Sequence, residues 1–373
     1  MTSTTLSPVV ALTKKVKGEE MPVRFFNVVS LFSGAGGLDL GLEMAGYSTR
    51  ACVEIDPVFR ETMRRNRPDW NPLDDFDGDV TCITSDLLLE RADLTKGQVD
   101  LLVGGPPCQS FSNMGNRKGV KDARGRLFRD YLRLVYEIRP LGIIFENVEG
   151  IKQHGVLDEL QKELEAMGYK VKCETVIAAD YGVPQKRKRV IVLGCLGVEP
   201  RFPKPTHSRF GDVPETKRWV TVGETFQKIT VQDLLRPDCL GMNHSLEMVN
   251  RMKMVPPGGN FHDLPKKHLP DCWKSGKHQG QDTFGRLKLN EPSVTIRTSG
   301  YNPTKGRYIH PTENRGLNTL EMAALQSFPK DFMFVGNLKS VGVQIGNAVP
   351  PLLAKAIGEA MKPCLVEARL KLH

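Results

Sequence analysis

A short segment, Asp100–Gly115 with the sequence DLLVGGPPCQSFSNMG, constrains the fold of this chain more than any other. Its apolar run, 101–103, is typical of a buried strand. Two glycines then allow a sharp turn, and two prolines stiffen the chain and remove two backbone donors. The segment therefore presents the thiol of Cys108 on a rigid loop just past a strand end, where ligands bind in open α/β sheets.

Most cysteines of intracellular proteins are small, inert core residues. The glycines and prolines before Cys108 make a poor core strand, so its setting favours a nucleophile instead. The eight cysteines of the chain are scattered, and none forms a C-x-x-C pair. Neither a zinc site nor a disulfide framework is therefore expected, and free thiols fit a reducing compartment.

Length and charge bound the class of protein. The chain has 373 residues, of which 40% are hydrophobic and 25% charged, as in soluble proteins with about two domains. Its net charge of +9 suits a polyanionic partner. No apolar run is long enough for a membrane span. Residues 1–24 are rich in Ser and Thr and are expected to form a disordered tail.

A second feature precedes the Cys108 segment. An expected strand at 27–32 is followed by the glycine-rich turn Ser33–Gly37 and an expected helix at 38–45. This order makes a nucleotide-type cradle, because glycines admit a ligand to the backbone and a helix start offers free N–H groups. Glu54 follows Gly34 by 20 residues, at a strand end, where an acid binds ribose hydroxyls. The third glycine of the dinucleotide pattern is missing, which favours a single nucleoside without a pyrophosphate.

Two features near this region stay open on the sequence alone. Asp86 is either an acceptor for an adenine amino group or an ordinary loop aspartate. The loop 113–129 carries six arginines and lysines against one acid. It is either a solvated surface or a lid that closes over a phosphate backbone.

Further polar groups follow later strands. Glu146 comes directly after the apolar run 142–145, where partial desolvation is expected to raise its pKa and favour proton donation. In the extended segment after 179, period-two alternation places Gln185, Arg187 and Arg189 on one face. Because a buried strand continues at 190–193, these arginines are expected to point to a defined place.

The composition changes after Cys195. Residues 195–290 are rich in Pro, Gly, Lys and His, which predicts a second, smaller, loop-rich domain suited to recognition. Its histidines show no metal-ligand spacing. A strand at 292–298 and a capped helix at 319–327 follow. The last helix, 352–361, has one apolar stripe and is expected to pack on the first domain, which would leave Gly346 and Asn347 near the glycine turn.

These segments, in this order, resemble the cytosine carbon-5 DNA methyltransferases of the bacterial restriction-modification type. The resemblance covers about 25–195 and 290–360 and rests on five motifs: Phe32–Gly37, Pro106–Gln109, Glu146–Val148, Gln185-x-Arg187-x-Arg189 and Gly346–Pro351. It implies a Rossmann-like, S-adenosylmethionine-dependent sheet. It also implies a catalytic domain at 25–195, a target-recognition domain with its connection at 196–335, and a returning segment at 336–373.

The resemblance also implies the site residues. The cofactor residues would be Phe32, Ser33, Gly34, Ala35, Gly36, Gly37, Glu54, Ile55, Asp86, Pro106, Asn347 and Ala348. Cys108 would be the nucleophile that adds to carbon 6 of a flipped cytosine, and Glu146 the acid at nitrogen 3. Arg189 would hold the base oxygen and Arg187 would support Cys108 or the backbone. The DNA contacts would be Gln109, Ser112, Arg117, Lys118 and Arg297, and no step needs a metal.

Two other functions share part of this motif pattern. Transfer-RNA cytosine methyltransferases of the same fold carry a Cys-Phe-Thr segment, whereas Cys195, Cys239 and Cys272 are followed here by Leu, Leu and Trp. An inactive DNA-binding regulator would be expected to lack Cys108, Glu146 or the cofactor turn. We therefore expect a monomeric enzyme acting on duplex DNA, in the bacterial cytoplasm at the nucleoid, or in the nucleus of a eukaryote.

Overall fold

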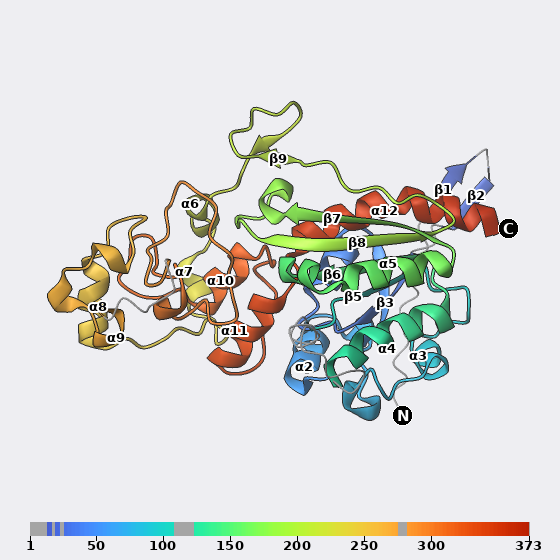
Figure 1. The fold of residues 1–373 in the computed structure, drawn as a ribbon, viewed down its shortest axis with the longest axis horizontal. Coiled ribbons are helices and arrows are strands. Elements are labelled where there is room, and N and C mark those ends of the chain that lie inside the picture. Colours follow the sequence, from blue (N-terminus) through green and yellow to red (C-terminus); the bar gives the residue numbers. More distant parts are fainter. Residues whose placement is uncertain (1–12, 17–18, 23–25, 108–122, 275–281, 373) are drawn as a thin grey trace, which may run out of the picture.

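The computed structural model describes residues 13–16, 19–22, 26–107, 123–274 and 282–372 (Figure 1). Its centre is a six-stranded sheet with the strand order β4-β3-β5-β6-β8-β7. The strands are β3 (Phe26–Leu31), β4 (Tyr47–Val53), β5 (Leu101–Gly104), β6 (Gly142–Asn147), β7 (Tyr169–Ile177) and β8 (Lys188–Leu196). The first four are parallel, whereas β8 is antiparallel to both of its neighbours. This confirms the expected α/β class.

Helices cover both faces of the sheet because its strands are apolar on both sides. Val28 and Leu101 belong to the core on one face, and Val29 and Leu102 to the core on the other. The first face packs against α1 (Gly37–Met44) and α12 (Pro351–Leu372). The second packs against α3 (Ser85–Arg91), α4 (Ala123–Ile138) and α5 (Val156–Ala166).

A looser part of the chain lies to one side of the sheet, at the left of Figure 1. Its short helices are α6 (Val222–Phe226), α7 (Val231–Leu234), α8 (Leu246–Lys253) and α9 (Asp271–Lys274). A small core of its own includes Met252, Phe261 and Phe284. Two-residue strands, β9 (His207–Ser208) and β10 (Lys217–Arg218), pair in a projecting loop. The expected loop-rich character is therefore observed.

A fourth apolar cluster joins the two parts. It contains residues of α10 (Thr319–Leu325) and α11 (Leu338–Asn347), such as Leu325 and Ile345. The same cluster includes Ala35 from the glycine turn and Trp70 from the η1 turn (Pro68–Trp70) after α2 (Pro57–Asn66). The end of the looser part is thus packed directly against the start of the sheet.

Several elements differ from the sequence expectation, among them the last helix, which continues to Leu372 instead of ending at 361. The segment 292–298 is extended but forms only one isolated bridge, between Gln185 and Ser293, and no strand. Helix α4 begins at Ala123, eight residues before its expected start, because Phe128 continues its buried stripe. Part of the expected tail pairs as an antiparallel hairpin, β1 (Thr13–Val16) and β2 (Glu19–Pro22), whereas residues 1–12 lie outside the described residues.

Candidate active site

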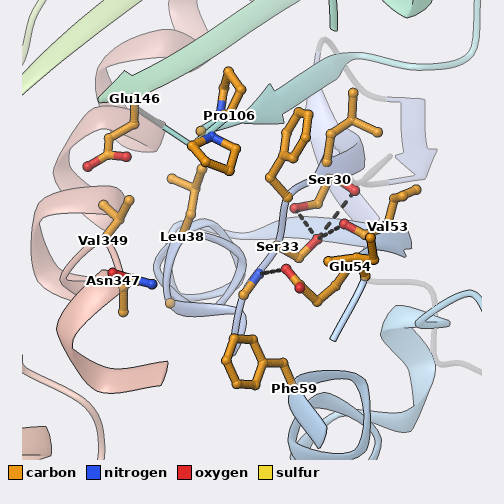
Figure 2. Close-up of a pocket in the computed structure, with 18 of the residues that line it drawn as sticks. Ser30, Ser33, Leu38, Val53, Glu54, Phe59, Pro106, Glu146, Asn347 and Val349 are labelled. Carbon is orange, nitrogen blue, oxygen red and sulfur yellow. Dashed lines mark hydrogen bonds between the residues drawn. The ribbon is translucent and has the colours of Figure 1, made fainter. Parts of the chain in front are cut away.

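A cavity of about 520 Å³ opens at the carboxyl ends of β3, β5 and β6 (Figure 2). Its wall combines the glycine turn, the end of β4, the Pro106–Pro107 segment and the end of α11. In Figure 2, Glu146 and Asn347 lie on one side of the turn and Glu54 on the other. The sheet therefore brings together motifs that are far apart in the sequence and that were expected to bind a cofactor or to catalyse.

The glycine turn has an unusual backbone. Phe32 (φ 55°), Gly34 (φ 58°) and Gly36 (φ 80°) all adopt left-handed conformations, which for Phe32 costs about 1–3 kcal/mol. A Cβ atom at Gly36 would lie 2.4 Å from a ring carbon of Trp70, so the turn passes too close for any side chain. Phe32, Ser33, Gly34 and Gly37 line the cavity, whereas Ala35 and Gly36 lie behind its wall.

Glu54 fixes the opposite edge of the cavity. Its carboxylate accepts hydrogen bonds from the backbone N–H of Gly34 (2.7 Å) and of Asp56 (2.9 Å). Burial raises the pKa of Glu54, and these two N–H donors oppose that rise. The acid therefore ties the glycine turn to the end of β4, and Ile55 next to it also lines the cavity.

Asp86 lies elsewhere than expected. It is exposed in the first turn of α3 and does not line the cavity, so the structure does not support it as a cofactor residue. Asp79 lines the wall instead. Asp79 reaches the cavity because the preceding residue, Gly78 (φ 72°), lies against the backbone of Glu54. A Cβ atom at Gly78 would lie 2.0 Å from the carbonyl oxygen of Glu54. The Gly78–Asp79 pair, which follows the acidic segment 74–77, is the sequence signal that could have identified this position.

The Pro106–Pro107 segment enters the cavity wall after β5. Asn147, at the end of β6, donates from Nδ2 to the carbonyl of Pro106 at 2.9 Å and so holds this segment in place. A Cβ atom at Gly105 would lie 3.0 Å from a carboxylate oxygen of Glu146, so β5 and Glu146 are in close contact. Cys108 follows at once along the chain but lies outside the described residues, as do Gln109, Ser112, Arg117 and Lys118.

Glu146 and Arg189 form an ion pair at the cavity wall. Arg189 Nε lies 2.7 Å from Glu146 Oε1, and the two side chains are only 10% and 11% exposed. Arg189 also donates to the carbonyl of Lys188. The apolar setting expected for Glu146 is thus only part of its environment, because a guanidinium faces the carboxylate. The pair presents an acceptor and a donor to the same space.

The alternation at 185–189 is observed, but it leads to two different places. Lys186 and Lys188 are exposed, whereas Gln185, Arg187 and Arg189 are buried. Arg189 lines the cavity, whereas Arg187 does not and is 0% exposed. The guanidinium of Arg187 donates to the carbonyls of Ile296 and Gly346. Within the described structure, Arg187 thus contacts backbone; Cys108 lies outside it.

The end of α11 completes the wall. Asn347 and Ala348 line the cavity, and a Cβ atom at Gly37 would lie 2.6 Å from the carbonyl of Val349. The return of the chain to the glycine turn, expected from the last helix, is therefore observed. Arg297 is exposed and is not part of this wall.

Among the described residues, no group of three or more His, Cys, Asp or Glu side chains is arranged to hold a metal ion. No described helix is both long and apolar enough to cross a membrane.

The chain is similar to known proteins over most of its length. The family model of C-5 cytosine-specific DNA methylases matches residues 26–363. The type II methyltransferase M1.HphI of Haemophilus parahaemolyticus is 37% identical over 340 residues, which cover 89% of this chain and 86% of that protein. M.PspPI of a Psychrobacter species is 36% identical, with 92% and 81% covered.

Solved structures show the same fold. A prophage-encoded DNA modification methyltransferase candidate from Escherichia coli gives a TM-score of 0.70 at 24% identity, over 91% of this chain and 99% of that chain. The Dnmt2 methyltransferase of S. pombe gives 0.59 at 18% identity, over 91% and 99%. Because the family model and the bacterial relatives cover nearly the whole chain, the chain belongs to the C-5 cytosine-specific DNA methylases of the restriction-modification type.

Proposed function

We propose that the cavity binds S-adenosylmethionine beside a cytosine flipped out of duplex DNA, and that Cys108 is the nucleophile. One observation carries the proposal. The Glu146–Arg189 pair, with its 2.7 Å contact, shares a single cavity with the glycine turn and with the segment that leads into Cys108. Groups for a base and groups for a nucleoside cofactor are therefore close enough to serve one reaction.

The cavity suits a nucleoside cofactor. Its volume of about 520 Å³ is within the range of small-molecule sites. Glu54 would accept from ribose hydroxyls, and Asp79 in place of Asp86 would accept from the adenine amino group. Phe32, the glycine turn, Ile55, Pro106, Asn347 and Ala348 would surround the remainder. When bound there, S-adenosylmethionine would supply an electrophilic methyl group, with a thioether as the leaving group.

The side chains would act on the base in turn. The Cys108 thiolate forms a bond to carbon 6, which makes carbon 5 nucleophilic. Glu146 holds nitrogen 3 and stabilises the charge that develops there, while Arg189 holds the base oxygen and keeps Glu146 in position. After transfer, a base removes the proton from carbon 5, and the bond between carbon 6 and sulfur breaks to release the thiolate.

Duplex DNA would be held mainly through its phosphates. The net charge of +9 supports such a partner. Arg297 is the described candidate contact, and Gln109, Ser112, Arg117 and Lys118 are candidates outside the described residues. Flipping the cytosine costs a few kcal/mol, which phosphate contacts offset. We propose that the enzyme acts as a monomer in the compartment that holds the DNA.

The decisive test is methyl transfer itself. The protein is incubated with S-adenosylmethionine labelled in its methyl group and with either unmethylated duplex DNA or tRNA. We expect label in 5-methylcytosine of DNA only. Cys108→Ser should abolish the transfer and leave cofactor binding unchanged within about two-fold, because the sulfur is needed only for attack on the base.

Two outcomes would contradict the proposal. Label in tRNA but not in DNA would reassign the substrate, and label in neither would favour a DNA-binding regulator. If Cys108→Ser bound the cofactor much more weakly than the unchanged protein, Cys108 would have a structural role. A covalent complex trapped on DNA containing 5-fluorocytosine, with the unchanged protein but not with Cys108→Ser, would identify the attacking atom.

A further inference from the structure

The guanidinium of Arg187 is buried between two segments that come from distant parts of the chain. Its Nη1 donates to the carbonyl of Ile296 at 3.0 Å, and its Nη2 donates to the carbonyl of Gly346 at 2.7 Å. The side chain is 0% exposed and is absent from the cavity wall. Arg187 is therefore part of the protein interior, where it connects two backbone segments.

These two carbonyls have informative neighbours. Ile296 immediately precedes Arg297, the described candidate DNA contact, and Gly346 immediately precedes Asn347, a cofactor candidate at the cavity wall. Arg189, two residues further along the chain, is paired with Glu146. The Arg187 guanidinium thus holds the backbone next to Arg297, the candidate DNA contact, and the backbone next to Asn347, the candidate cofactor residue.

The two segments also touch each other directly. A Cβ atom at Gly346 would lie 2.3 Å from the backbone nitrogen of Thr298 and 2.5 Å from the carbonyl carbon of Arg297. Such a contact leaves no space for a side chain. Any shift of the segment 296–298 must therefore move the end of α11 as well, because the backbones are in contact and share Arg187.

Two buried amides strengthen the same junction. Gln185 accepts from the N–H of Ile296 at 2.9 Å and donates to Gln326 Oε1 at 2.9 Å. Gln326 in turn donates to the carbonyl of Ile345 at 2.6 Å. We call Gln185, Arg187, Ile296, Gln326 and Gly346 the Arg187 junction. Its polar groups replace the strand pairing that the segment 292–298 lacks.

Burying a guanidinium on carbonyls alone is costly, and apolar side chains of similar volume often pack more favourably. Burial holds the pKa of Arg187 well below its ordinary range, and the charge of Arg189 acts in the same direction. The side chain bonds no carboxylate directly in the described structure. Its presence is better explained by the two backbone segments that it holds than by a gain in stability.

We propose that Arg187 is a positioning residue that couples cofactor binding to DNA binding through the Arg187 junction. This inference rests on the proposed function, in which Asn347 contacts the cofactor and Arg297 contacts DNA. A ligand at either site orders the shared backbone, so the second ligand binds at a lower entropic cost. The coupling is reciprocal, since each ligand must strengthen the other by the same factor.

The test measures that factor. The affinity for S-adenosylhomocysteine, which cannot react, is measured by calorimetry with and without saturating unmethylated duplex DNA of random sequence. We expect DNA to tighten binding on the order of ten-fold in the unchanged protein. Arg187→Lys keeps the charge but has no planar fork to bridge both carbonyls, so the factor should fall to about one.

Arg286→Lys is the matched control. Arg286 is 5% exposed and donates to the carbonyls of Met252, Val255 and His310, all within the looser part. Its loss should lower stability and leave the coupling factor unchanged. A factor near one in the unchanged protein, or a full factor in Arg187→Lys, would overturn the proposal, as would an equal loss in both variants.

A measurement on the unchanged protein covers the case in which Arg187→Lys does not fold. S-Adenosylhomocysteine alone should slow hydrogen exchange at the amides of residues 297–300, which lie beyond the cavity wall. No change there would overturn the coupling. A protein that methylates DNA but binds its two ligands independently would refute only this inference, whereas absence of methyl transfer would refute the proposed function.

Discussion

At the scale of single residues, the proposed catalytic role of the Glu146–Arg189 pair can be tested directly. Glu146→Gln keeps the shape of the side chain and removes its charge. We expect methyl transfer to slow by about 10²–10⁴-fold, because the acid no longer stabilises charge on the base. Affinity for duplex DNA, measured by titration, should change only a few-fold. Glu149→Gln is the control, because the Glu149 side chain is 52% exposed and forms a long ion pair with Lys188, at 3.9 Å.

Equal losses of rate and of DNA affinity in Glu146→Gln would contradict the assigned role. Folding must be checked in parallel, because the substitution leaves the buried Arg189 without its carboxylate. Cofactor binding by the variant, at close to the affinity of the unchanged protein, provides that check.

A second buried acid opposes folding at neutral pH. Asp39 in α1 is fully buried, and neither carboxylate oxygen makes a hydrogen bond of normal geometry with a described residue. Burial raises the pKa of Asp39 from 3.8 to about 7, and the nearby Ser30 hydroxyl only partly opposes this. The folded protein therefore holds this proton more tightly than the unfolded chain does. Stability should fall as the pH rises from about 4 to 7.

Asp39→Asn tests this dependence by removing the titration. Below about pH 4 the variant and the unchanged protein should have similar free energies of unfolding, because Asp39 is then neutral in both the folded and the unfolded state. Above pH 7 the variant should be more stable by a few kcal/mol, with about 4 kcal/mol as the upper value. Denaturant unfolding at several pH values measures this. The exposed Asp86→Asn is the control, and a pH-independent difference would contradict the prediction.

At the scale of elements, the glycine turn depends on space as well as on backbone freedom. Gly36 and Gly34 both have positive φ, but only Gly36 faces Trp70, whereas a Cβ atom at Gly34 would meet nothing within 4 Å. Trp70 cannot withdraw easily, because it is 3% exposed and donates to Glu43 at 2.9 Å. The two glycines therefore form a matched pair.

Gly36→Ala should lower the free energy of unfolding more than Gly34→Ala does. Both substitutions carry the cost of a left-handed alanine, about 1 kcal/mol, and only the first adds a clash, worth about 1–3 kcal/mol more. Urea unfolding without cofactor compares them. Equal losses would mean that Trp70 moves aside and that the turn is governed by backbone conformation alone.

The elements also show what sequence reasoning could reach. Local sequence patterns predicted the strand ends, the glycine turn and Glu54. In the folded sheet these features lie around one cavity, as expected. Period-two alternation correctly predicted that Arg187 and Arg189 lie on one face. It could not distinguish a side chain that lines a cavity from one that is buried in the core. That distinction depends on Ile296 and Gly346, which arrive from more than 100 residues away. Asp79 was missed because a backbone contact at Gly78, not a strand end, brings it to the cavity.

At the scale of the whole molecule, three apolar cores and a joining cluster set the geometry. The joining cluster packs Leu325 and Ile345 against Ala35 and Trp70, so the looser part cannot reorient without disturbing the glycine turn. Composition predicted a loop-rich second part, but it could not show that α10 and α11 belong to the joining cluster. Their apolar stripes are compatible with either part, and only the assembled fold decides between them.

The whole-molecule charge predicts how DNA binding responds to salt. The logarithm of the affinity for duplex DNA should fall linearly with the logarithm of salt concentration, because phosphate contacts release counterions. Arg297→Ala should weaken binding to all sequences alike and reduce the slope by about 0.9, the value for one lost phosphate contact. Lys162→Ala, which removes another exposed cation, on α5, should leave the slope unchanged. If Arg297→Ala kept the slope but relaxed the choice of methylated sequence, Arg297 would contact a base edge instead of a phosphate.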